Sequence, residues 1–216
     1  VKFDKIRHLG NAVSELYRAR GPFPRVFDFM DHRYLHFLEA FKTIPGALVM
    51  VEMDGDAPNS ASWKLNNLFD LMLRNGAIET KSIKNKEWEN LLRIRYSHQE
   101  KLKTHEKLLL MGEVMDSSVS KLPDLIVETR ELQEELCKKF TGLDSYLFGH
   151  IGALSFHPGF SAPIDWSYEK FKSVSQEVRE KLLDIKIKYG ASVSEQGIFP
   201  EHKDWFICTY GKENYD

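Results

Sequence analysis

The feature that most constrains the fold is a rhythm of strand-like and helix-like segments that occurs twice along the chain. Each half contains short runs rich in β-branched and large apolar residues, separated by amphipathic stretches of helical periodicity. The predicted strands are ALVMVEM (47–53) and NGAIETKSI (75–83) in the first half, and LLLMGEVMD (108–116) and SYLFGHIGALSFH (145–157) in the second. The predicted helices cover residues 3–20, 32–42, 60–74, 88–96, 122–140 and 165–190.

Two successive βαβ-like units predict an α+β fold. The simplest form is a duplicated ferredoxin-like arrangement, with one mostly antiparallel sheet and helices packed on one face. A chain of 216 residues is long enough for one domain of ordinary size.

The composition argues against several classes of protein. Basic and acidic residues nearly balance, at 30 and 32, and no basic block occurs, so we expect no nucleic-acid binding. The longest apolar run, PGALVMVEM at 45–53, is far too short to cross a bilayer and predicts no transmembrane segment. The two cysteines, Cys137 and Cys208, are too few for a disulfide framework, which favours a cytoplasmic location.

Two histidines in the segment HIGALSFHP are candidate metal ligands. His150 and His157 lie seven residues apart, which is an odd number. Side chains of an unbroken strand alternate between its faces, so the two imidazoles would point to opposite sides. A shared metal site therefore requires a bulge or bend, for which Gly152 is a suitable position. The alternative is two unrelated histidines at the ends of one strand.

A metal site also needs a third ligand, because two ligands make a poor site. Glu195, in the segment YGASVSEQGIF, follows the last predicted helix and is the best candidate. Two imidazoles and one carboxylate with an open position would suit zinc, manganese or iron.

Five segments resemble motifs of one protein family, the FAD-linked oxidases and dehydrogenases. This family includes the glycolate oxidase large subunit, D-lactate dehydrogenase and D-2-hydroxyglutarate dehydrogenase. HIGALSFH resembles the family's His-x-Gly-Asp-Gly-Asn-x-His pattern, and YGASVSEQGI resembles its Gly-Gly-Ser-(Ile/Val)-Ser-Gly-Glu-His-Gly segment. The other three similar blocks are PRVFDFMD, LVMVEMDG and EVMDSSVSKLPDLI. The blocks occur in the family's order and cover about residues 22–205.

The resemblance implies that residues 22–216 form the substrate-binding cap domain of such a flavoenzyme. FAD would then be bound mainly by a separate FAD-binding domain or subunit, and residues 1–21 would be the helix that connects to it. We find no Gly-rich flavin-phosphate segment in the sequence, so we expect the chain to be a fragment or one subunit of a split enzyme.

The resemblance also implies roles for individual residues. His150, His157 and Glu195 match the family's ligands for a divalent metal. The family's arginine that binds the substrate carboxylate matches Arg93 in WENLLRIRYS, with Arg95 as the alternative. Arginine suits this task because its guanidinium can donate two parallel hydrogen bonds to a carboxylate. Ser155 is a further candidate for a contact with substrate.

Departures from the family pattern fall at the catalytic positions. Gln196 stands where the family has its catalytic histidine, and an amide cannot accept a proton near neutral pH. His202 is a weak substitute, because its position differs from that of the family's histidine. Phe199 replaces a glycine of the pocket wall, which favours a larger and more apolar substrate or loss of turnover.

The sequence therefore predicts a cap domain that helps an FAD-dependent oxidoreductase to oxidise a small 2-hydroxy acid such as glycolate or D-lactate, in a protein that could form homo-oligomers. The alternative is a non-catalytic ferredoxin-like binding or scaffold module. The glutamine at position 196 is the feature that favours this alternative.

Overall fold

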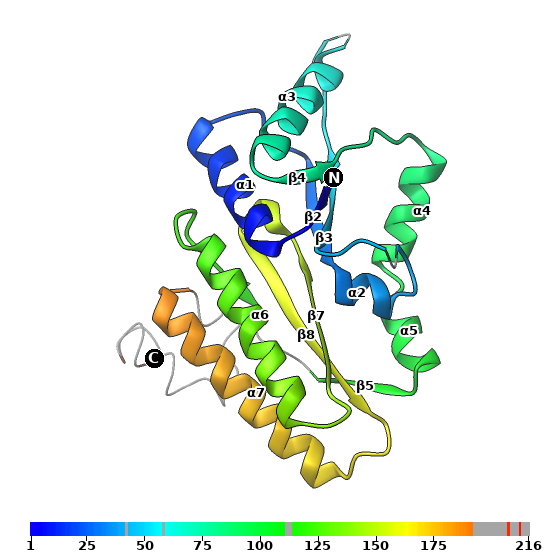
Figure 1. The fold of residues 1–216 in the computed structure, drawn as a ribbon, viewed down its shortest axis with the longest axis vertical. Helices are drawn as coiled ribbons and strands as arrows, with labels where there is room; N and C mark the ends of the chain where they lie inside the picture. Colours follow the sequence, from blue (N-terminus) through cyan, green and yellow to red (C-terminus); the bar gives the residue numbers. More distant parts are fainter. Residues whose placement is uncertain (42, 58, 111–113, 192–206, 208–211, 213–216) are drawn as a thin grey trace.

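One antiparallel sheet joins the two halves of the chain (Figure 1). The computed structural model describes residues 1–41, 43–57, 59–110, 114–191, 207 and 212. The sheet has eight strands in the order β4-β1-β3-β2-β7-β8-β5, and β6 pairs separately with β8. Its strands are β1 (Lys2–Phe3), β2 (Val26–Asp31), β3 (Ala47–Glu52), β4 (Ala77–Glu79), β5 (Lys107–Leu110), β6 (Met115–Asp116), β7 (Asp144–Gly149) and β8 (Ser155–Pro163).

The helices differ in length and in position. Four are long, namely α1 (Ile6–Ala19), α3 (Ser60–Arg74), α6 (Leu122–Lys139) and α7 (Tyr168–Tyr189). Three are shorter, namely α2 (His32–Phe37), α4 (Lys86–Arg95) and α5 (His98–Thr104). Within the described ranges, no helix has the length and apolar character that a membrane span needs.

The strand order confirms the predicted α+β class with an antiparallel sheet. The first half runs β1-α1-β2-α2-β3-α3-β4 with the spatial order β4-β1-β3-β2. Apart from the short α2 between β2 and β3, this is the ferredoxin-like βαββαβ arrangement. In the second half α6 precedes the β7–β8 hairpin and α7 follows it, and β5 pairs with β8. The two halves join where β2 pairs with β7. Helices α4 and α5 form the connection between them.

Each face of the sheet carries its own apolar core. The long helices pack on one face, as predicted, where alternate residues of β2 such as Phe27 and Phe29 meet Leu9 and Leu125. The short helices lie over the opposite face, which carries Met30, Leu48, Met50 and Tyr146, and which we call the short-helix face. Side chains alternate between the two faces of a strand, so neighbouring residues of β2 contribute to different cores.

The first 21 residues lie within the sheet and its core. Strand β1 pairs with both β3 and β4, and α1 packs against α6. The two helices approach closely at Gly10, where an added Cβ would lie 2.8 Å from the Cα atom of Pro123. The predicted helix at 3–20 is confirmed as α1, and it packs as an integral part of the fold.

The prediction of one continuous strand at residues 145–157 is wrong. The chain forms a hairpin instead, in which β7 ends at Gly149 and β8 begins at Ser155. A single 3₁₀ turn at Ile151–Ala153 and a left-handed Leu154, at φ 58°, reverse the chain between them. Apolar periodicity alone does not reveal this reversal, because Ile151 and Leu154 continue the apolar pattern through the turn.

Candidate functional site

The hairpin places both candidate histidines on the short-helix face. His157 pairs with Phe148 in the β7–β8 ladder, and His150 lies two residues beyond Phe148. The two ring centroids are 5.9 Å apart and the ring planes are nearly perpendicular, at 87°. The odd spacing of the two histidines required a bulge or bend between them, and the turn at Ile151–Ala153, which contains Gly152, is that bend. His150 directly follows β7 and His157 lies in β8, so the turn brings their rings together.

Asp28 of β2 orients His150. One carboxylate oxygen of Asp28 lies 2.8 Å from Nδ1 of His150. A carboxylate can only accept a hydrogen bond, so Nδ1 carries a proton, and in the neutral ring it is Nε2 that has the lone pair. The side chain of Asp28 is buried at 9% exposure, whereas that of His150 is 54% exposed. The basic nitrogen of His150 is thereby fixed in one tautomer on an accessible ring.

Arg95, at the end of α4, reaches the same carboxylate from the other side. Its side chain is 7% exposed, and Nε lies 3.6 Å from the second oxygen of Asp28. The guanidinium carbon lies 4.8 Å from the ring centroid of Phe148. Leu91, one turn earlier, packs into the core of the short-helix face, which directs this side of α4 towards the sheet.

Arg93, the better match by sequence, lies elsewhere on α4. It is exposed, and its guanidinium donates to Oδ1 of Asn90 at 2.8 Å. Of the two arginines predicted as substrate ligands, Arg95 is the one beside the histidines. Ser155 also lies near them, buried at the start of β8, and its backbone N–H donates to the carbonyl of His150 at 3.3 Å.

His157 is held neutral. Burial lowers its pKa to about 4, helped by the nearby His150 and Arg95 and opposed by Asp28. A neutral imidazole at physiological pH keeps one nitrogen lone pair, which can accept a hydrogen bond or bind a cation.

An aromatic cluster lies next to the site on the short-helix face. The rings of Tyr34 and Phe148 stack at 4.4 Å. His98 lies between two tyrosine hydroxyls, with Nδ1 3.2 Å from Tyr34 and Nε2 3.3 Å from Tyr146. Burial and the charge of Arg95 lower the pKa of His98 to about 4. This cluster closes one side of the site with neutral groups.

Sequence reasoning missed both Asp28 and His98. The alternation of side chains along a strand could have indicated Asp28. It stands between Phe27 and Phe29, which lie in the core under the long helices, so its own side chain points to the other face of the sheet. Nothing local indicates the burial of His98, since its partners Tyr34 and Tyr146 are distant in the chain.

The remaining predicted site residues lie outside the described residues. These are Glu195, Gln196 and His202. Among the residues that the structure does describe, no group of three or more histidine, cysteine, aspartate or glutamate side chains could hold a metal ion. The third metal ligand predicted from the sequence therefore remains a prediction.

A family model places the chain among known proteins. The model described as FAD linked oxidases, C-terminal domain, matches residues 1–216. The chain belongs to this family. The resemblance predicted from five sequence motifs is thereby confirmed at the level of the family. A comparison with curated protein sequences gave no match.

Solved structures support the fold of this FAD-linked oxidase C-terminal domain. Two crystal forms of alkyldihydroxyacetonephosphate synthase match it, at 14% and 15% sequence identity and TM-scores of 0.61 and 0.57. The matches cover 96% and 88% of this chain, but only 42% and 38% of the synthase chains. At this identity the similarity concerns the fold alone. The domain spans less than half the length of these neighbours.

Proposed function

We propose that this domain binds and orients the substrate of an FAD-dependent oxidoreductase that oxidises a small 2-hydroxy acid, such as glycolate or D-lactate. The observation that carries the proposal is the convergence of Asp28, Arg95, His150 and His157 from separate elements onto one face of the sheet. Together they offer a cation held by an ion pair and two imidazole rings beside an aromatic wall.

Arg95 is the proposed ligand of the substrate carboxylate. The ion pair with Asp28 and the contact with Phe148 hold its guanidinium in place, so little side-chain freedom is lost when a ligand binds. A guanidinium can donate two parallel hydrogen bonds to one carboxylate, which fixes both the position and the orientation of a 2-hydroxy acid.

His150 is the proposed acceptor of the substrate's hydroxyl proton. Its Nε2 carries the lone pair, and Asp28 would stabilise the imidazolium that forms when the proton arrives. This assignment provides a base although position 196 is a glutamine. It replaces the weaker candidate His202.

The site is suited to a flavin presented from outside the domain. The ring of His150 is 54% exposed although its partner Asp28 is buried, so substrate held here would remain accessible on one side. Bound FAD would supply the acceptor for the hydride that leaves the substrate carbon. In this proposal a separate domain or subunit binds most of the FAD.

A divalent ion of zinc, manganese or iron is a second proposal for the same side chains. The contact between Asp28 and His150 favours this second proposal. The carboxylate accepts a hydrogen bond from Nδ1 of His150 and leaves Nε2 available, and metal-bound histidines commonly make the same contact with a carboxylate. His150, His157 and Glu195 would be the ligands, and the ion would polarise the substrate oxygens.

Metal analysis of the purified protein checks this second proposal. We expect a stoichiometric ion in the unmodified chain and its loss in His157→Ala, with His105→Ala as the control. A protein that contains no ion at all, or one that keeps it in His157→Ala, would contradict the metal proposal and leave His150 as the proton acceptor.

Anaerobic reduction of the flavin tests the proposed activity in the enzyme that carries this domain. We expect a 2-hydroxy acid to bleach the flavin, and its methyl ester to react about 10²-fold more slowly, because the ester lacks the charge that Arg95 binds. Alkyldihydroxyacetone phosphate, suggested by the name of the structural neighbours, belongs in the same panel. If no member of the panel reduces the flavin, the non-catalytic scaffold is the better account.

A further inference from the structure

The turn at Ile151–Ala153, which joins the two candidate histidines, is followed by a strained residue. Leu154 has a left-handed backbone at φ 58°, a conformation that costs free energy for a residue with a side chain. Such a residue keeps this conformation only where its surroundings impose it. Its carbonyl accepts the N–H of Ser117, at 3.1 Å, from the segment that follows β6. The shape of the turn therefore depends on contacts from outside the hairpin.

Tyr17 of α1 makes a second contact of this kind. Its hydroxyl donates to the carbonyl of Gly152 at 2.5 Å, although the two residues are 135 positions apart in the chain. Burial raises the pKa of Tyr17, so the hydroxyl keeps its proton and remains a donor. The ring packs against the ring of Phe23, with 4.7 Å between their centroids. Removal of the hydroxyl would leave this ring contact in place and the carbonyl of Gly152 without its partner.

Strand β2 connects the turn to His150. An added Cβ at Gly152 would lie 2.6 Å from the Cβ atom of Phe27, so the turn packs directly on this strand. Ile151 is buried in the core under the long helices. Asp28, the next residue of β2, points to the other face and lies 2.8 Å from Nδ1 of His150. Two neighbouring residues of β2 thus contact the turn on one face and His150 on the other.

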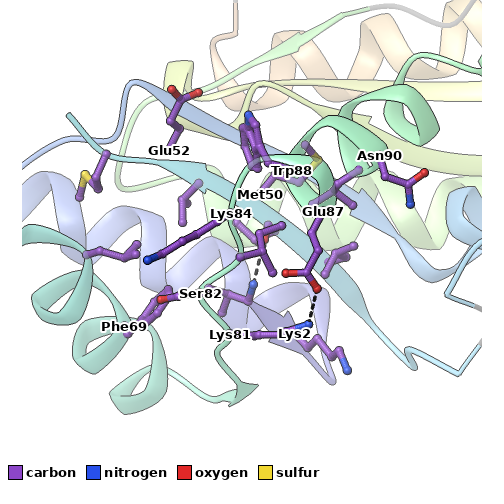
Figure 2. A pocket seen from close by; sticks show the side chains of 18 of the residues that line it. Lys2, Met50, Glu52, Phe69, Lys81, Ser82, Lys84, Glu87, Trp88 and Asn90 are labelled. Carbon is purple, nitrogen blue, oxygen red and sulfur yellow. Dashed lines mark hydrogen bonds and ion pairs between the residues drawn. The ribbon is translucent and has the colours of Figure 1, made fainter. Parts of the chain in front are cut away.

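A cavity of about 850 Å³ beside β3 lies apart from this arrangement (Figure 2). Met50 of β3 and Trp88 of α4 line it. None of the described residues that line this cavity belongs to the turn or carries a side chain of the candidate site. The cavity therefore takes no part in fixing His150.

We propose that Tyr17 is a positioning residue, whose hydrogen bond to Gly152 fixes the turn and so keeps His150 within bonding distance of Asp28. This role rests on the proposed function, in which Nε2 of His150 accepts the proton of the substrate hydroxyl. The bond to Asp28 selects the tautomer that has its lone pair at Nε2. A looser turn would weaken that bond and admit the other tautomer, in which Nε2 carries the proton and cannot accept one.

Nitrogen-15 NMR of the imidazole rings tests this role in the 216-residue chain, without flavin or substrate. At about pH 8.5, where free histidine is neutral, we expect Nε2 of His150 to be unprotonated in the unmodified chain. In Tyr17→Phe we expect the Nε2 signal to shift towards that of a protonated nitrogen. Tyr189→Phe is the matched control, because it also removes a hydroxyl that makes a hydrogen bond, 2.8 Å from Glu128, but on α7. The control should leave the signal of His150 unchanged.

Flavin reduction in the enzyme that carries this domain provides the second readout. We expect Tyr17→Phe to slow reduction by about tenfold, for a 2-hydroxy acid and for its methyl ester alike, because the proton acceptor is displaced and Arg95 is not. The ratio of the two rates should stay near about 10².

The two readouts separate this role from the proposed function. An Nε2 signal of His150 that is the same in Tyr17→Phe and in the unmodified chain would overturn the positioning role. Where the unmodified enzyme is reduced by a 2-hydroxy acid, an equal rate in Tyr17→Phe would overturn it as well. If no 2-hydroxy acid reduces the flavin, the proposed function fails, whereas a shifted Nε2 signal would still show that Tyr17 fixes His150.

Discussion

Replacing His150 with glutamine is expected to slow reduction of the flavin by about 10²–10⁴-fold in the enzyme that carries this domain. Glutamine is close in size to histidine and can still bond to Asp28, but it cannot accept a proton near neutral pH. Stopped-flow absorbance of the flavin, measured under anaerobic conditions with saturating 2-hydroxy acid, reports this step directly.

A second histidine provides the matched control for this variant. His8 of α1 also bonds to an aspartate through Nδ1, at 2.9 Å from Asp4, but it lies away from the short-helix face. We expect His8→Gln to leave the rate of reduction within about twofold of the unmodified enzyme. Equal rates in His150→Gln and in the unmodified enzyme would show that His150 does not accept the proton.

Replacing Arg130 with alanine is expected to lower the free energy of unfolding by about 3–5 kcal/mol. Arg130 of α6 forms a buried ion pair with Asp31, whose side chain is 2% exposed at the end of β2. The other oxygen of Asp31 accepts the N–H of Tyr34 at 2.8 Å and caps α2. Without Arg130, the carboxylate would remain buried with its charge uncompensated.

The ion pair of Arg33 with Glu134 is the control for this loss of stability. Its groups are 3.0 Å apart but 31% and 42% exposed, so solvent already screens them. We expect Arg33→Ala to cost less than about 1 kcal/mol in urea unfolding. If Arg130→Ala and Arg33→Ala lowered the free energy of unfolding by similar amounts, burial would not explain why the pair of Arg130 and Asp31 stabilises the fold.

Much of the fold could be predicted from the sequence because its long elements have strong periodic patterns. Helices α6 and α7 follow their predicted ranges closely, and Gly190, at φ 62°, ends α7 at the last residue of its predicted range. Strand β8 and helix α5 were not predicted as separate elements. Their boundaries depend on a tight turn and on tertiary packing, which local periodicity does not encode.

The candidate site could be predicted only in part. The structure brings the two histidines together, and the turn at Ile151–Ala153 is the bend that their odd spacing required. The sequence did not show that this bend is a complete reversal of the chain. The choice between Arg93 and Arg95 depended on which side of α4 faces the sheet. Both positions are flanked by apolar residues, so the sequence favours neither orientation. The alternation of β2 indicates which face Asp28 is on, but its contact with His150 depends on the pairing of β2 with β7, which the sequence does not show.

The central claim is that Arg95 binds the carboxylate of a 2-hydroxy acid, and one ratio tests it most directly. The ratio of flavin-reduction rates for the acid and its methyl ester should fall from about 10² in the unmodified enzyme to about one in Arg95→Met. It should be unchanged in Arg93→Met, which alters the same residue type on an exposed part of the same helix. An acid preference that survives in Arg95→Met, or that disappears in Arg93→Met, would contradict the account.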